Sequence, residues 1–219
     1  MTNRLIPIRI ARAVRAQYAS PNRFYHNLNH LDHLFSVETK IFEKFAYNEV
    51  IANDGDLPII ANEAYSQLTL AVLFHDVEYN IWLGSPYNEN DSALMLENVY
   101  GEVLMDEGEW SQEDISTVAQ MIRTTAYHNK DNSSASFMEK LMLDIDISNF
   151  AESLDVCKYN QEQIYLEFQP RFPDKNKFLA GNVSFLESLL DRPTLYYTPM
   201  FADKEAQARQ NIEAMIKGS

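Results

Sequence analysis

Three of the five histidines in the chain lie within eight positions of one another, in the segment Arg23-Phe-Tyr-His26-Asn-Leu-Asn-His30-Leu-Asp-His33. If this segment is helical, His26 and His30 lie one turn apart on the same face. Two such imidazoles can ligate one ion, or one can ligate while the other handles a proton. A pair of surface histidines is the alternative interpretation. His33 points about 60° away from His30 and is expected to be structural.

A His-Asp pair follows the most apolar segment of the chain. The segment Leu68–Phe74 leads directly into His75 and Asp76. Polar groups at the end of a buried helix are costly unless they are satisfied, and a metal ion would satisfy both side chains at once. The partial negative charge of a helix C-terminus also favours a nearby cation. The alternative is an aspartate that hydrogen-bonds its neighbouring histidine.

Further acidic and imidazole side chains could complete such a site. Asp144 and Asp146 alternate with apolar residues. In a helix they point about 200° apart, so one can face a buried site while the other faces away or braces the fold. The spacing does not decide between them, and a capping role is the alternative. Glu89 and His128 could complete the shell of a second ion or orient water, or could be surface residues.

Helices are needed to bring these distant side chains together. Apolar residues recur at three and four positions, which is the helical period. The pattern predicts helices over 30–45, 61–77, 88–105, 111–127, 137–147, 155–168, 175–190 and 204–217. Chain breaks are expected at 53–58, 84–86, 133–136, 171–173 and 192–193. The 61–77 helix should be central, and Ser111 with Asp114 forms a capping-box signal. No strand pair with a hairpin turn stands out, so a single all-α domain is predicted over residues 1–219.

Charge and composition exclude some partners. The formal net charge is −14 and the pI is about 4.7. So acidic a surface repels the phosphate backbone of a nucleic-acid duplex, although a local pocket can still hold a small phosphate ester. The sequence has no apolar run of membrane-spanning length. Its single cysteine, Cys157, permits no intrachain disulfide. A cytoplasmic protein is expected, and a homo-oligomer is left open.

The order of these motifs resembles the HD superfamily of metal-dependent phosphohydrolases. The segment Tyr25-His26-Asn27-Leu28-Asn29-His30 is similar to the Tyr-His-Asn-x-x-His segment of the related cyclic nucleotide phosphodiesterases. In those enzymes the first histidine protonates the leaving oxygen and the second binds metal. Asp146-Ile-Ser-Asn149 is similar to the Asp-Leu-Ser-Asn segment at their last metal ligand. The resemblance therefore implies that His26 is the acid, and it selects Asp146 over Asp144.

The whole chain looks like one bacterial group of HD phosphohydrolases. The shared pieces run from residue 23 to residue 211: Arg23-Phe-Tyr-His26, Phe74-His75-Asp76, Asn88-Glu89-Asn-Asp-Ser92-Ala93, Thr125-Ala-Tyr-His128, Asp144-Ile-Asp146-Ile and Ala208-Arg209-Gln-Asn211. The segment Val77-Glu78-Tyr79 departs from the His-Pro-Gly segment that follows the His-Asp pair in phosphodiesterases. Their glutamine-and-aromatic base clamp cannot be located either. Cyclic nucleotide hydrolysis therefore does not carry over, and neither do the substrates of the nucleotide-pool and stringent-response members.

The resemblance implies an HD-domain or phosphodiesterase-like bundle that hydrolyses a phosphomonoester or phosphodiester by a metal-activated water. The expected metal ligands are His30, His75, Asp76 and Asp146. Imidazole with carboxylate suits Mn²⁺, Zn²⁺, Fe²⁺, Co²⁺ or Ni²⁺, as one or two ions, with Mg²⁺ an alternative at a second site. His26 and Asp76 are the expected catalytic residues. Arg23 could clamp the phosphate through its planar fork, or it could be a surface residue.

Two other functions compete with hydrolysis. An HD-type di-iron oxygenase uses similar ligands but needs more histidines, and only His128 is left to supply one. A non-catalytic HD protein that binds a small molecule would not need an intact ligand set. Metal analysis and turnover assays separate these alternatives.

Overall fold

The computed structural model describes residues 4–51 and 62–218, and within these ranges the chain is helical and contains no strand. The all-α prediction is therefore confirmed. The predicted break at 53–58 lies outside the described residues. The α-helices are α1 (Ile8–Tyr18), α2 (Leu28–Ile51), α3 (Asn62–Phe74), α4 (Tyr87–Met95), α5 (Gly101–Gly108), α6 (Gln112–Thr124), α7 (Phe137–Asp146), α8 (Leu154–Phe168), α9 (Lys175–Leu190) and α10 (Glu205–Lys217). Shorter turns are the π-helical η1 (Leu96–Tyr100) and the 3₁₀ segments η2 (Thr125–Tyr127), η3 (Ser148–Ala151) and η4 (Pro199–Phe201).

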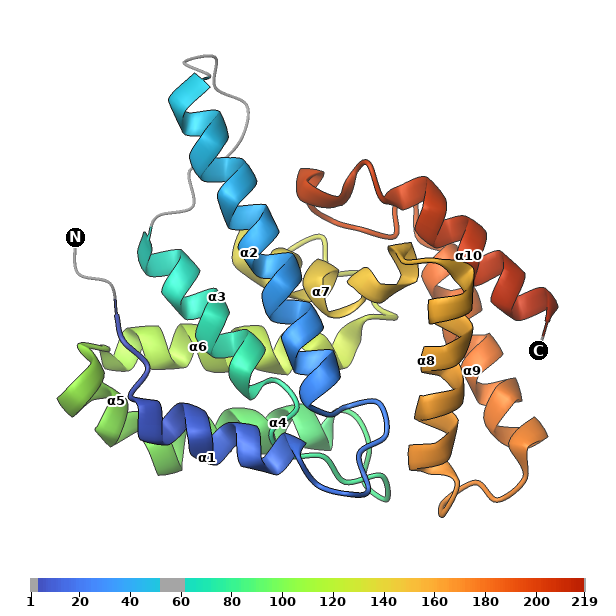
Figure 1. The fold of residues 1–219 in the computed structure, drawn as a ribbon, viewed down its shortest axis with the longest axis horizontal. Helices are drawn as coiled ribbons and strands as arrows, with labels where there is room; N and C mark the ends of the chain where they lie inside the picture. Colours follow the sequence, from blue (N-terminus) through green and yellow to red (C-terminus); the bar gives the residue numbers. More distant parts are fainter. Residues whose placement is uncertain (1–3, 52–61, 219) are drawn as a thin grey trace.

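Helix α3 lies at the centre of the fold, as the sequence predicts. Every residue from Leu70 to Phe74 is buried, and α3 packs against α1, α2, α6 and α7. In Figure 1, α1 and α3–α6 lie on one side and α8–α10, coloured orange to red, lie on the other, with α2 and α7 between them. The burial of these apolar side chains anchors the C-terminal end of α3, which is where the His-Asp pair begins.

The start of the chain contains a helix that was not predicted. In α1 the residues Ile10, Val14 and Tyr18 are buried and follow one another at intervals of four. The arginines between these residues obscured the helical period in the sequence, because the buried apolar stripe is only one residue wide per turn. Helix α1 matters to the site, since the Tyr18 hydroxyl accepts a hydrogen bond from the backbone N–H of Asp76.

Other boundaries differ from the prediction in small ways. The 88–105 helix is divided by the π-helical turn η1 into α4 and α5. Ser111 and Asp114 form the predicted capping box, and Ser136 with Glu139 forms a second one at the start of α7 that was not predicted. Among the described residues, no helix combines the length and the apolar character needed to span a bilayer.

Candidate metal centre

His75 and Asp76 lie immediately after α3. The His75 side chain is 1% exposed, and its Nδ1 lies 2.9 Å from the carbonyl oxygen of Val72. Because a carbonyl can only accept, Nδ1 carries the hydrogen in neutral imidazole and Nε2 presents a lone pair to the interior. This is the tautomer that a metal ligand requires.

His30 presents a second imidazole from the first turn of α2. Its side chain is 3% exposed, and its ring centre lies 5.5 Å from that of His75. Burial lowers the pKa of His30, so its neutral form is favoured. Nε2 of both histidines is buried and makes no hydrogen bond. Two such unpaired buried nitrogens side by side are costly unless a cation or proton lies between them.

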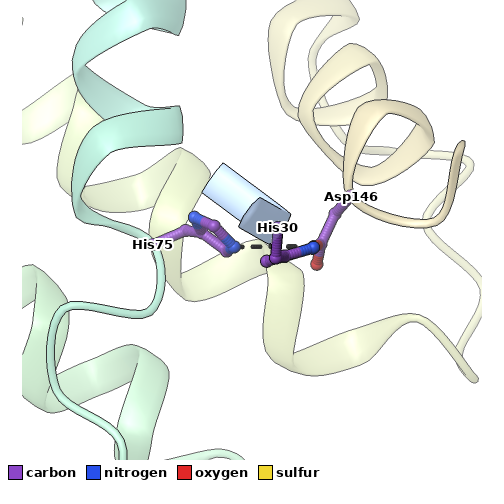
Figure 2. Close-up of side chains that lie close together, drawn as sticks. All are labelled: His30, His75 and Asp146. Atoms are coloured by element: carbon purple, nitrogen blue, oxygen red, sulfur yellow. Dashed lines mark ion pairs between the residues drawn. The ribbon is translucent and has the colours of Figure 1, made fainter. Parts of the chain in front are cut away.

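Asp146 completes the cluster from the last residue of α7. Its Oδ1 lies 3.7 Å from Nε2 of His30 and 3.6 Å from Nε2 of His75. Figure 2 shows the three side chains, from three separate segments, converging on one point. One ligand atom from each residue lies within 4.8 Å of the others. Ligands bound to one ion at about 2.1 Å are separated by roughly 3.5 Å, so this cluster could hold a metal ion.

Asp76 borders the same cluster. Its Oδ2 lies 3.0 Å from Nε2 of His75 and 3.9 Å from Nε2 of His30, without hydrogen-bonding either. Burial opposes its charge, but the neighbouring His75 holds the pKa of Asp76 well below its usual range. Burial of the imidazole ring lowers the pKa of His75, but Asp76 and Asp146 outweigh this effect and raise the pKa to about 9. The carboxylates are thus arranged to hold positive charge at this point.

Asp144 faces away from the cluster. It is fully buried, and its carboxylate accepts hydrogen bonds from the backbone N–H of Tyr197 at 2.8 Å and of Thr198 at 2.7 Å. The hydroxyl of Thr198 donates a third at 2.6 Å. Asp144 therefore braces the segment before η4, while Asp146 faces the two imidazoles. Both lie within α7, as the prediction of one inward and one bracing aspartate requires.

His26 lies close to the cluster but outside the helix. Helix α2 begins at Leu28, so the expectation that His26 and His30 share a helical face is wrong. Their ring centres are nevertheless 5.7 Å apart, because the turn before α2 folds His26 back. The His26 ring stacks on Tyr79 with centres 4.2 Å apart.

A glutamate that the sequence did not reveal holds His26 in place. Oε2 of Glu167, in α8, lies 2.7 Å from Nδ1 of His26. Its Oε1 accepts the backbone N–H groups of Tyr25 and His26, each at 2.8 Å. Although burial of the ring acts in the opposite direction, Glu167 raises the pKa of His26. A buried glutamate in an otherwise amphipathic helix, 141 positions away, gives no local signal.

Two of the additional candidates lie near the cluster. Nε2 of His128 lies 2.8 Å from Oδ2 of Asp146, and Nδ1 of His128 is buried without a partner. Glu89, in the first turn of α4, has one buried carboxylate oxygen without a partner. Burial, followed by the charge of Asp76, raises the pKa of Glu89. His128 therefore contacts Asp146, and Glu89 lies close enough to Asp76 to be affected by its charge.

Two further residues take structural positions. Arg23 donates to backbone carbonyls, including those of Asp76 and Val77. His33 lies 3.2 Å from the hydroxyl of Ser148, in agreement with its expected structural role.

No family model, curated protein or solved structure matches the chain.

A small cavity lies beside His30, which is the one residue of the cluster that lines it. It has a volume of about 280 Å³ and is lined by His30, by aromatic rings and by several amide side chains. The lining residues include Tyr25, Asn27, Asn149 and Gln163. This volume is enough for a small polar ligand to approach His30.

Proposed function

We propose that the protein is a metal-dependent hydrolase of phosphate esters, of the HD type. The observation that carries this proposal is the convergence of two buried, hydrogen-bond-free imidazole nitrogens, of His30 and His75, on Asp146. The donor set of imidazole and carboxylate suits Mn²⁺, Zn²⁺, Fe²⁺, Co²⁺ or Ni²⁺. Asp76 supplies a further oxygen at the edge of this set.

A bound divalent ion supplies Lewis-acid chemistry, which polarises a phosphoryl oxygen and lowers the pKa of water. The protein's own part is to hold the donors in place and to manage the proton of the leaving group. His26 is suited to the second task because Glu167 fixes Nδ1 and raises the imidazole pKa. A proton held on Nε2 of His26 can then pass to the departing oxygen, which contributes about 10²–10⁴ in rate.

His128 has a supporting role in this proposal. Its contact with Oδ2 of Asp146 orients that carboxylate, so that Oδ1 faces His30 and His75. Such a partner behind a ligand fixes the ligand's orientation and tunes its basicity. The modest volume of the cavity beside His30 favours a small phosphate ester as the substrate.

The direct test combines elemental analysis with a screen of phosphate esters under metal supplementation. Asp76→Ala should remove metal and hydrolysis together, whereas His26→Ala should retain metal and lose about 10²–10⁴ in kcat. Asp106→Ala, an exposed change in α5, serves as the control. Redox-active iron without ester hydrolysis would instead favour the oxygenase alternative, and binding without turnover would favour the non-catalytic one.

A further inference from the structure

Arg23 makes an unusual set of contacts with the main chain around the candidate site. Its NH1 donates to the carbonyl oxygen of Asp76 at 2.6 Å and to that of His26 at 3.3 Å. Its NH2 donates to the carbonyl oxygen of Val77 at 2.8 Å. One guanidinium thus joins the segment that carries the proposed acid to the segment that carries the metal ligand.

Tyr18 binds the backbone of Asp76 on the other side of its Cα, at the N–H group. The Tyr18 hydroxyl accepts the backbone N–H of Asp76 at 3.1 Å and donates to the carbonyl oxygen of Leu73 at 3.1 Å. The tyrosine is fully buried, so these bonds do not compete with water. The N–H and the C=O of Asp76 are therefore both bound by side chains from outside its own segment.

Aromatic rings fix the arginine in turn. The guanidinium carbon lies 5.0 Å from the ring centre of Tyr18 and 5.5 Å from that of Tyr79. Tyr79 is also the ring on which His26 stacks. Cation–π attraction of this kind depends on the planar, delocalised guanidinium of arginine.

We infer that Arg23 and Tyr18 are positioning residues that set the direction of the Asp76 carboxylate by clamping its backbone. Asp76 lies beyond the end of α3, where no helical hydrogen bond would otherwise fix its carbonyl. A shift of a fraction of an ångström there moves the carboxylate relative to His30 and His75. Arg23 thereby acts through Asp76, and the phosphate clamp that the sequence leaves open for it is the competing role. This inference rests on the proposed metal site, but it does not need hydrolysis to be the reaction.

The test measures the affinity of the purified full-length chain for Co²⁺ and Zn²⁺ in competition with a chromophoric chelator. Loss of a residue that orients a metal ligand weakens metal binding by about 10- to 100-fold. We expect this loss in Arg23→Gln and in Tyr18→Phe, with a changed Co²⁺ absorption spectrum that reports altered coordination. Arg23→Lys should recover part of the affinity, because lysine can still donate to one carbonyl.

Matched controls separate positioning from general stability. Arg171→Gln removes an arginine whose NH1 donates to the carbonyl of Ile81, in the same segment as Val77 but away from Asp76. Tyr165→Phe removes a tyrosine hydroxyl that contacts the carbonyl of Pro173. Both should keep the metal affinity and the Co²⁺ spectrum of the unmodified protein, even if thermal stability falls. Should Arg23→Gln fail to fold, Tyr18→Phe and Arg23→Lys still give the answer.

Two outcomes would overturn the inference. One is metal affinity within twofold of the unmodified protein in folded variants at both positions. The other is unchanged metal affinity combined with weaker binding of inorganic phosphate in Arg23→Gln, which would make Arg23 a phosphate clamp. A protein that binds metal but hydrolyses no ester would defeat the proposed function and leave the expected loss of metal affinity in place.

Discussion

Nδ1 of His26 and Oε2 of Glu167 lie 2.7 Å apart although 141 positions separate the two residues in the chain. The same carboxylate accepts the backbone N–H of His26, so the ring and its backbone are fixed together. This arrangement leaves Nε2 of His26 free to handle a proton near the candidate metal centre. Helix α8 is thereby part of the site, although it supplies none of the proposed ligands.

Glu167→Gln should shift the pH dependence of hydrolysis. Glu167 raises the pKa of His26, and a general acid is active only while protonated. Without the carboxylate the pKa of His26 falls, so the alkaline limb of the kcat profile should move to lower pH. At pH 8 we expect a loss on the order of tenfold or more.

The control for this change is Glu162→Gln, on the exposed side of the same helix, where Glu162 pairs with Lys175. That variant should leave the alkaline limb in place, and metal content should stay unchanged in both proteins. A Glu167→Gln profile that overlays the unmodified one would show that His26 is not the acid.

Asp144 and Asp146 should respond in opposite ways to the same substitution. Asp146→Asn should abolish metal binding, because Asp146 faces the histidine cluster. Asp144→Asn should keep the metal but lose about 1–3 kcal/mol of unfolding free energy, since an amide cannot accept all three hydrogen bonds. Urea titration of the apo protein and metal analysis of each variant provide the two measurements. The reverse pattern would assign the ligand to Asp144.

Removal of metal should lower the melting temperature of the unmodified protein. The three cluster residues come from α2, from the segment after α3 and from α7, so an ion would link these segments. At a free metal concentration 1,000-fold above Kd, binding contributes about 4 kcal/mol. For a chain of this size that corresponds to a shift on the order of 10 °C. Differential scanning calorimetry with and without a chelator measures it, and Asp146→Asn should show no shift. An equal response in both proteins would place the ion elsewhere.

The sequence revealed those site residues whose signal is local. His75 and Asp76 end an apolar helix, and this position alone indicates buried polar groups in need of a partner. Helical geometry also predicts that Asp144 and Asp146 face opposite directions, and the structure confirms it. The choice of Asp146 came from the resemblance, and its position beside His30 and His75 supports that choice.

The sequence does not reveal the contacts of residues that meet the site only through tertiary packing. Glu167 and Tyr18 meet the site only because α8 and α1 pack beside it, and no spacing in the sequence encodes that meeting. Arg23 lies next to the histidine segment, which leaves it open as a phosphate clamp or a surface residue, and its donors are directed at main-chain carbonyls. Which acceptor an arginine finds depends on the tertiary packing around it, so the sequence could identify the residue without its partner.

Glu38 gives the stability of the protein a pH dependence that is independent of the site chemistry. This glutamate of α2 is 2% exposed, and Thr69 of α3 donates a hydrogen bond to it at 2.6 Å. Burial raises the pKa of Glu38 from 4.5 to about 7. The folded state therefore binds a proton more tightly than the unfolded state. Stability falls as pH rises from about 4.5 through 7, by roughly 3 kcal/mol once the group is ionised in both states.

Glu38→Gln should remove this part of the pH dependence. A neutral amide keeps an acceptor for the Thr69 hydroxyl and carries no charge to desolvate, so the variant should gain stability above pH 7 and differ little near pH 4.5. Urea unfolding of the apo protein at several pH values measures the effect. Glu43→Gln, an exposed change in the same helix, should leave the slope of stability against pH unaltered. If Glu38→Gln and the unmodified protein lose stability in parallel between pH 5 and 8, then Glu38 is ionised in the fold at little cost and another buried group sets the pH dependence.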